Sequence, residues 1–212
     1  MPEISFKERV KNIAIQEAIN YKRNFVDCEY LICSDAFTLK SHYIIDAKPD
    51  NFQHLVGVNS LISPQLFYNK CCDGTLEESD FNFIKRGQSE VSVKGSVRRK
   101  IVVLPKMVNI FQNTVMVEES FVKNQIFCTF AASDGVCTLG FIDSSKSRPM
   151  SLVKGNELNL SKAKTINILL SRGAGEEKFT KVIVGDFETL TKHYEILKEH
   201  IDESIFDKLN LL

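Results

Sequence analysis

The chain has 212 residues, of which 43% are hydrophobic and 25% are charged, with 27 basic residues against 27 acidic ones. This composition indicates a globular protein with one substantial core, and it excludes collagen, coiled-coil and disordered chains. Because the formal net charge is zero, any surface that binds a polyanion must be a local cluster of basic residues.

No apolar run in the sequence approaches the roughly 18 residues that a membrane-spanning helix needs. The run from Ile101 to Leu104 ends at Pro105, and the run from Ile166 to Leu170 is broken by Asn167. The first nine residues mix acidic with basic side chains and have no apolar signal core. We therefore expect a cytoplasmic protein that does not bind a membrane.

The six cysteines form no C-x-x-C pair and no cysteine–histidine spacing of the kind that closes a zinc site. They are Cys28, Cys33, Cys71, Cys72, Cys128 and Cys137. Isolated cysteines within apolar segments are typical of small hydrophobic core residues. We expect no metal, no cofactor and no disulfide scaffold.

The N-terminal segment from Ile4 to Tyr21 is predicted to be an amphipathic helix, because its apolar residues recur at spacings of three and four. Two strand-like runs follow, Phe25–Cys33 and Phe37–Asp46. Apolar and polar residues alternate in the second run, which predicts a hairpin with one polar face.

The stretch between Pro49 and Asn113 is predicted to be mainly helical. Helices are expected over Phe52–Val56, Gln65–Cys72, a short piece from Ser79 to Phe83, and Val97–Phe111. Ser63 and Pro64 provide the N-cap and first position of the second helix, and Asp73-Gly74 ends it. Pro105 predicts a kink or break in the last one.

After Asn113 the sequence becomes rich in strand-forming residues. Strands are expected over Thr114–Val117, Gln125–Ala132, Val136–Ile142, Met150–Val153, Thr165–Ser171 and Phe179–Val184. Ser133-Asp134-Gly135 and the segment from Arg172 to Glu177, which includes Gly173-x-Gly175, are predicted hairpin turns. Gly173-x-Gly175 lacks the spacing and context of a nucleotide-binding loop.

A final helix is expected from Phe187 to Phe206, capped by Asp186 and carrying one apolar stripe. The fold class is therefore α+β: an N-terminal helix and hairpin, central helices, a mostly antiparallel sheet and a C-terminal helix. We expect a single domain over residues 1–212. A division near Ala47 is the alternative, because Ala47-Lys48-Pro49-Asp50 is the best break in the first quarter.

The strongest charge anomaly is the segment from Lys85 to Lys106, which holds seven basic residues and one acid, Glu90. Within it, Arg98, Arg99 and Lys100 are candidates for binding nucleic acid, because arginine can bond two phosphate oxygens at once. A solvated helix face explains the same charges equally well.

His54 is the histidine with the most informative surroundings, Asn51-Phe52-Gln53-His54-Leu55-Val56-Gly57. Its apolar neighbours place it at the edge of the core, where its pKa can be tuned. Taken alone it is more often a packed structural histidine. His42 is expected on the polar face of its strand, and His193 and His200 on the solvated side of the last helix.

Several short motifs, taken in order, resemble one family. They are Asn51-Phe52-x-His54-Leu55-x-Gly57, the Ser63–Cys72 helix with Phe67-Tyr68, the kinked helix after it, and Cys137-x-Leu139-Gly140-Phe141. The resemblance is to the phage-associated barnase, EndoU, colicin and RelE-like nuclease domains. It runs from about Phe37 to Val184 and leaves the first thirty residues and the last helix outside.

The resemblance implies a toxin-type domain that cuts RNA without a metal, by attack of a ribose 2′-hydroxyl on the adjacent phosphate. It assigns His54 as a catalytic residue by motif. Arg172, Lys178 and Thr180 are further catalytic candidates, because they lie in the late hairpin where such sheets present polar groups. Each also has a purely structural interpretation: Arg172 as a turn residue, and Lys178 and Thr180 as part of the solvent-exposed face of a strand.

Two functions from different classes remain open. The first is an endoribonuclease whose partners are RNA and, in a toxin-type system, an inhibitor protein. The second is a non-catalytic phage or mobile-element module that binds a protein with the same surface, since fold does not fix function.

Overall fold

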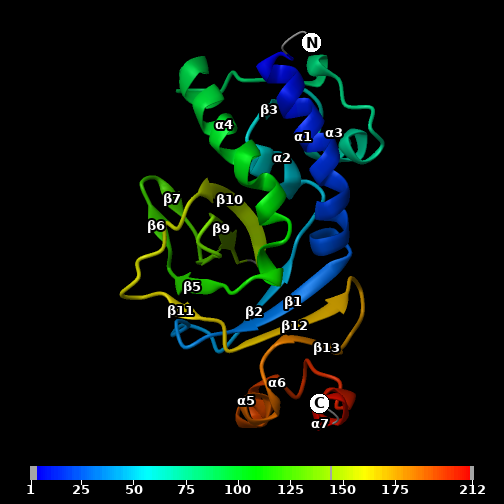
Figure 1. The fold of residues 1–212 in the computed structure, drawn as a ribbon, viewed down its shortest axis with the longest axis vertical. Coiled ribbons are helices and arrows are strands. Elements are labelled where there is room, and N and C mark those ends of the chain that lie inside the picture. The colour runs from blue at the N-terminus through cyan, green and yellow to red at the C-terminus, as the bar shows by residue number, and fades with distance from the viewer. Residues whose placement is uncertain (1–3, 144, 211–212) are drawn as a thin grey trace.

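Two antiparallel sheets form the centre of the fold, and helices lie at both ends of the molecule (Figure 1). The computed structural model describes residues 4–143 and 145–210. The strand order is β13-β12-β1-β2 in one sheet and β10-β9-β8-β5-β11 in the other. The α+β class is confirmed. Among the described helices, none is both long and apolar enough to cross a membrane.

The strands have the following bounds. The four-stranded sheet contains β1 (Cys28–Cys33), β2 (Tyr43–Asp46), β12 (Ile168–Gly173) and β13 (Lys181–Val184). The five-stranded sheet contains β5 (Met116–Glu119), β8 (Phe130–Ser133), β9 (Cys137–Ile142), β10 (Arg148–Lys154) and β11 (Lys164–Thr165). Two short pairs are β3 (Asn59–Ser60) with β4 (Phe81–Asn82), and β6 (Val122–Lys123) with β7 (Ile126–Phe127).

Ser147 joins the two sheets. Its N–H donates to the carbonyl of Ile44 at 2.7 Å, and its carbonyl accepts from the N–H of Asp46 at 2.9 Å. Ser147 directly precedes β10, so the edge strand β2 of one sheet meets the edge strand β10 of the other. The residue that leads into β10 therefore lies beside β2.

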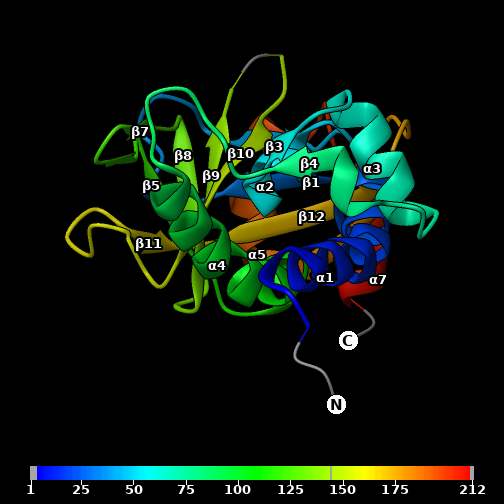
Figure 2. The same ribbon diagram turned by 90° about the horizontal axis from the view of Figure 1, so that it is seen from above.

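Four helices cover the N-terminal end of the molecule: α1 (Phe6–Tyr21), α2 (Asn51–Val56), α3 (Pro64–Cys72) and α4 (Glu90–Met107). The view from above in Figure 2 shows them at this end, and α2 packs against the other three. Shorter turns are a π-helical turn (Lys22–Val26) and two 3-10 turns (Glu78–Asp80 and Ile110–Gln112). Ser5, Ser63 and Ser89 each accept an N–H of the first turn of α1, α3 and α4.

The predicted helix around Pro105 is longer at its start than expected. It begins at Glu90, because the Ser89 hydroxyl caps it, and it continues through Pro105 to end two residues later at Met107. Because Pro105 has no N–H to donate to the carbonyl of Ile101, it weakens the last turn, and the helix ends soon after it. The predicted helix from Ser79 to Phe83 is wrong beyond Asp80, since Phe81–Asn82 pairs with Asn59–Ser60 as a strand.

The hairpin of β1 and β2 is confirmed, but the second strand begins only at Tyr43. The Glu119 carboxylate accepts the N–H groups of Thr38 and Leu39, which holds this segment as a loop. The expectation of one polar face is also wrong. Tyr30 and Ile32 lie in the main core, and Leu31 in a second core on the other face.

The C-terminal segment is not one helix. It forms α5 (Phe187–Lys192), α6 (Tyr194–Leu197) and α7 (Ser204–Asn210), with Asp186 capping α5 as predicted. The break occurs because Phe179 pairs with the intervening segment: its N–H donates to the His200 carbonyl, and its carbonyl accepts from Asp202. The apolar stripe still packs on the sheet, since Leu190 and Leu197 are fully buried.

Other predicted strands are confirmed with small shifts, but two are divided. Gln125–Ala132 forms parts of β7 and β8, and Thr165–Ser171 is split between β11 of one sheet and β12 of the other. All six cysteines are free thiols.

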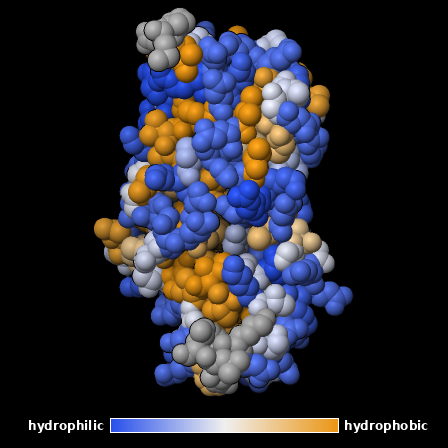
Figure 3. All heavy atoms as spheres, turned by 45° about the vertical axis from the view of Figure 1, so that its right-hand side comes forward, coloured by the Kyte–Doolittle hydropathy of each residue, from blue (hydrophilic) through white to orange (hydrophobic). Residues whose placement is uncertain are grey.

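On the face shown in Figure 3, apolar side chains form patches among polar ones, and one patch lies next to the C-terminal end.

Candidate active site

The structure places the predicted catalytic residues at two separate positions. His54 lies on α2, next to α4, where Lys100 and Lys85 are its charged neighbours. Arg172 is the next-to-last residue of β12, and Lys178 and Thr180 follow in the segment that leads to β13. Arg172 and Lys178 are charged neighbours of His200. The sequence therefore grouped His54 with residues that lie around a different histidine.

The His54 side chain is exposed, and among the described residues none makes a hydrogen bond to its ring nitrogens. Desolvation by surrounding protein atoms lowers its pKa, and the positive charges of Lys100 and Lys85 lower it further. A neutral imidazole beside two cations can accept a proton near a bound anion. The same geometry also fits a solvated histidine at the end of α2.

Lys100 supports α2 directly. Its ammonium donates to the carbonyl of His54 at 2.7 Å, in the last turn of α2. Its alkyl chain packs on Gly57, where an added Cβ would lie 2.7 Å from Lys100 Cδ and where φ is +90°. Burial, together with the charge of Lys85, lowers the pKa of Lys100 to about 8.

The three predicted nucleic-acid-binding residues point in different directions, as consecutive helix positions must. The guanidinium of Arg98 lies 5.1 Å from the centroid of the Phe6 ring. Arg99 and Lys100 instead line a groove beside α4. Only part of the basic segment therefore faces one binding surface.

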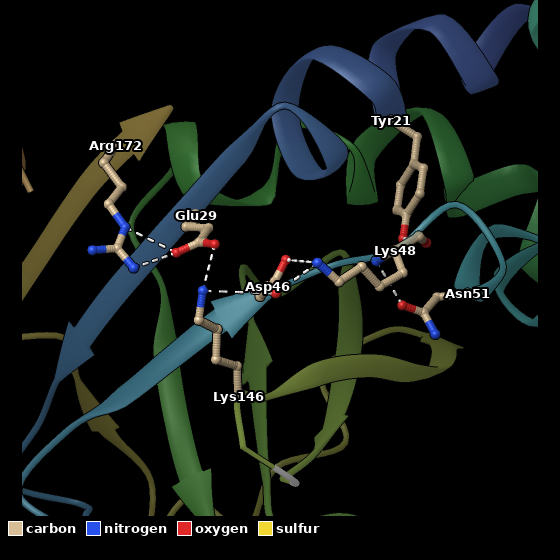
Figure 4. Close-up of polar contacts among 7 residues, drawn as sticks. All are labelled: Tyr21, Glu29, Asp46, Lys48, Asn51, Lys146 and Arg172. Carbon is tan, nitrogen blue, oxygen red and sulfur yellow. Dashed lines mark hydrogen bonds and ion pairs between the residues drawn. The ribbon is translucent and has the colours of Figure 1, made fainter. Parts of the chain in front are cut away.

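Arg172 is held in a buried ion pair (Figure 4). Its Nε and Nη2 donate to Glu29 Oε2 at 2.8 and 2.5 Å, and its guanidinium stacks 4.3 Å from the Phe179 ring centroid. Nη1 donates to the Glu177 carbonyl. The Arg172 side chain is only 9% exposed. It therefore fixes the β12–β13 turn to β1.

Glu29 also binds Lys146, which extends the ion pairs across the junction of the sheets. Lys146 Nζ lies 2.6 Å from Glu29 Oε1 and 3.8 Å from Asp46, and Asp46 pairs with Lys48 at 2.7 Å. Figure 4 shows this chain of contacts running from β12 to the segment that precedes α2. Lys146 is thus positioned by carboxylates that are themselves buried.

Lys178 and Thr180 lie beside the segment that carries His200. Lys178 Nζ donates to the carbonyl of Glu199 at 2.5 Å, and the residue between them, Phe179, hydrogen-bonds to the His200 backbone. Thr180 is partly buried in the same segment. The late hairpin therefore presents its polar groups toward the C-terminal helices.

A pair of histidines that was not predicted as a site lies here. The rings of His42 and His200 have centroids 4.8 Å apart and meet edge to face, with an interplanar angle of 62°. His42 precedes β2, and His200 lies between α6 and α7. The Ser41 hydroxyl lies 3.1 Å from His42 Nδ1, and no described residue hydrogen-bonds to His42 Nε2.

Both imidazoles are shifted toward the neutral form. Burial lowers the pKa of His42, with smaller contributions from His200 and Lys40. Burial also lowers the pKa of His200; Glu199 opposes this shift, while the charges of Arg172 and Lys178 add to it.

The histidine pair opens onto a pocket of about 370 Å³ that also contains Lys40, Asp143 and Lys146. Lys40 is paired with Asp143 and Lys146 with Glu29. The pocket thus holds two titratable imidazoles and two positioned ammonium groups within one small volume. Among the described residues, no group of histidine, cysteine and carboxylate side chains could hold a metal ion.

Sequence reasoning missed this pair because its members are far apart in the chain and neither lies in a recognisable motif. The sequence places His42 on the polar face of a predicted strand and His200 on the solvated side of the predicted last helix. The backbone pairing of Phe179 with the residues around His200 holds this segment on the four-stranded sheet, and Leu197 and Ile201 share a core with Leu31 of β1. No local sequence signal reports that contact.

A family model described as phage-Barnase-EndoU-ColicinE5/D-RelE like nuclease4 matches residues 14–211. The match is longer than the expected region 37–184, and it includes most of α1 and the C-terminal helices. Comparison with curated proteins and with solved structures gives no match.

Proposed function

Because the chain belongs to the phage-Barnase-EndoU-ColicinE5/D-RelE like nuclease4 family, we propose that it is a toxin-type endoribonuclease that needs no metal. The proposed reaction is attack of a ribose 2′-hydroxyl on the adjacent phosphate. The observation that carries the proposal is the contact between His42 and His200 in a pocket with two lysines.

This reaction requires a base, an acid and positive charge on the phosphate. In the proposal, one neutral imidazole of the pair accepts the 2′-hydroxyl proton while the 2′-oxygen forms a bond to phosphorus. The bond to the 5′-oxygen breaks, and the second imidazole donates a proton to that leaving oxygen. The bound phosphodiester raises the pKa of the imidazole that it touches, which supplies the protonated partner.

The cations around the pair have distinct proposed roles. Lys40 and Lys146 line the pocket and contribute charge to the phosphate oxygens. Arg172 and Lys178 act at longer range, because one is buried against Glu29 and the other is bonded to the Glu199 carbonyl. Thr180, in the same segment, would contribute a hydroxyl to the substrate.

His54 remains a second candidate for proton transfer, as the family resemblance implies. Its neighbours Lys100 and Lys85 would bind the phosphate there. The His42–His200 pocket is preferred because it holds two imidazoles, which can serve as base and acid in one step. Separate substitutions of the three histidines distinguish the two centres.

The test is incubation of the purified protein with RNA in the presence of EDTA. The proposal predicts cleavage that leaves a 2′,3′-cyclic phosphate and a 5′-hydroxyl end. An oligonucleotide with a single 2′-deoxyribose before the scissile phosphate should not be cut at that bond. Cleavage that depends on added metal, or cleavage of the 2′-deoxy bond, would contradict the proposal.

The alternative is a non-catalytic module that binds a protein through the same surface. One observation favours it: both pocket lysines already pair with carboxylates, which reduces the charge available to a phosphate. In that case the protein leaves RNA intact under all metal conditions, and substitution of His42 changes only binding to the protein partner.

A further inference from the structure

A second concave surface lies at the opposite end of β10 from the histidine pocket. It is a groove of about 800 Å³ between the α4 helix, the β6–β7 hairpin and the C-terminal half of β10. Its walls carry five cationic side chains and one carboxylate, Glu157. The cations are Lys85, Arg99, Lys100, Lys123 and Lys154.

Most of this positive charge is not neutralised within the protein. Lys123 pairs with Glu157 at 2.5 Å. Among the described residues, no carboxylate forms an ion pair with any of the other four cations. The charge of Lys85 lowers the pKa of Lys100, so these ammonium groups repel one another. An anion bound in the groove would relieve this repulsion. Cations that were spread over a solvated helix face would not repel one another in this way.

The groove also offers an aromatic surface and amide groups. Phe127, on the β6–β7 hairpin, is 70% exposed although it is a large apolar side chain. Gln88, Asn124 and Gln125 line the same groove. A groove that combines cations with an exposed aromatic ring is typical of proteins that bind single-stranded nucleic acid. The cations contact the phosphates, and the ring stacks on an unpaired base.

The groove and the histidine pocket are connected by one strand. Ser145 and Lys146 of the pocket precede β10, and Met150 to Lys154 of the groove form its second half. At about 3.3 Å of rise per residue, the four-residue step from Lys146 to Met150 separates their nearest backbone positions by roughly 13 Å. His54 adjoins the groove through Lys85 and Lys100.

We propose that this groove binds the backbone of single-stranded RNA at a position distinct from the cleavage pocket, with Arg99 and Lys154 on phosphates and Phe127 under a base. This inference rests on the proposed function for the identity of the strand as RNA. It assigns the groove to holding a substrate several nucleotides long, and not to the chemical step.

The probe is a fluorescent single-stranded 2′-O-methyl RNA of twelve nucleotides, which lacks the attacking hydroxyl and is not consumed. Its affinity is measured by anisotropy over a range of salt concentrations. The variant Arg99→Gln/Lys154→Gln removes two exposed cations from the groove. Lys94→Gln/Arg98→Gln is the matched control, because it also removes one lysine and one arginine, both from α4 and both lying over the Phe83 and Phe6 rings outside the groove.

The groove variant should bind about tenfold more weakly, and its slope of log affinity against log salt should fall by about 1.4, as expected for two lost phosphate contacts on a single strand. The control pair should stay within about twofold of the unaltered protein. Phe127→Ala should weaken binding about fivefold or more and leave the salt slope unchanged.

Equal affinity of the groove variant and its control would overturn the inference, as would tighter binding of a duplex than of the single strand. A dinucleotide substrate, too short to span both sites, separates this result from the proposed function. The groove variant should cleave it at the unaltered rate. Loss of dinucleotide cleavage in the groove variant would place these residues in the reaction centre and also contradict the inference.

Discussion

The buried carboxylate of Glu29 allows a test of how the candidate site is held together. Glu29 is 4% exposed and accepts two N–H groups of Arg172 and the ammonium of Lys146. Glu29→Gln keeps the side-chain shape but leaves the largely buried Arg172 guanidinium without its counter-charge. Removal of one member of a buried ion pair costs on the order of 3 to 5 kcal/mol.

Lys146 is one-third exposed and can recover solvation, so the lower end of that range, about 3 kcal/mol, is expected. The free energy of unfolding is measured by urea titration for Glu29→Gln, Arg172→Gln and the double variant. The double-mutant cycle should give a coupling of about 1 to 3 kcal/mol between the two residues. The control Glu195→Gln, in an exposed ion pair with Lys198, should change stability little.

A change below about 1 kcal/mol for Glu29→Gln, with no coupling to Arg172, would refute the interpretation that this ion pair holds the sheet junction. If Arg172→Gln lost RNA cleavage without any loss of stability, Arg172 would act on the substrate directly. The structure predicts instead that its effects on stability and on cleavage appear together.

Three further predictions concern the core, a backbone position and pH. Leu197→Ala should lower the free energy of unfolding by about 2 to 5 kcal/mol, because the side chain is fully buried against the sheet; a loss below about 0.5 kcal/mol would mean that the stripe is not core. Gly57→Ala should cost at least about 1 kcal/mol in the same titration, since φ is +90° and the new Cβ would meet Lys100; unchanged stability would contradict this. In the pH profile of kcat/KM for RNA cleavage, the acid limb should have its midpoint below the ordinary histidine pKa of about 6.5. The reason is that the lowered pKa of His42 and of His200 keeps both imidazoles neutral to lower pH. A midpoint above about 6.5 would exclude both histidines as the base.

Local signals predicted the parts of the fold that depend on local physics. Ser63 and Asp186 were recognisable caps because an N-cap hydroxyl or carboxylate acts within its own helical turn. The turn at Asp134-Gly135 was recognisable because Gly135 has a positive φ that glycine adopts at no cost. These positions needed no knowledge of the rest of the chain.

The parts that sequence reasoning missed depend on contacts between distant segments. The last helix reads as continuous from its apolar spacing, but the backbone pairing of Phe179 with His200 and Asp202 interrupts it. The His42–His200 contact likewise joins two segments that are far apart in the chain, so no local pattern indicates it. The N-terminal hairpin lost its polar face for a similar reason, since the C-terminal helices cover it.

The most direct test of the central claim is a set of four single histidine variants assayed for RNA cleavage in EDTA. His42→Ala and His200→Ala should each lose roughly a hundredfold or more in rate, the usual contribution of a general acid or base. His193→Ala is the matched control, because its Nδ1 bonds the Thr189 carbonyl outside the pocket, and it should keep its activity. The account predicts that His54→Ala retains most of its activity; full activity of His42→Ala and His200→Ala together with loss of activity in His54→Ala would contradict it and move the reaction to α2.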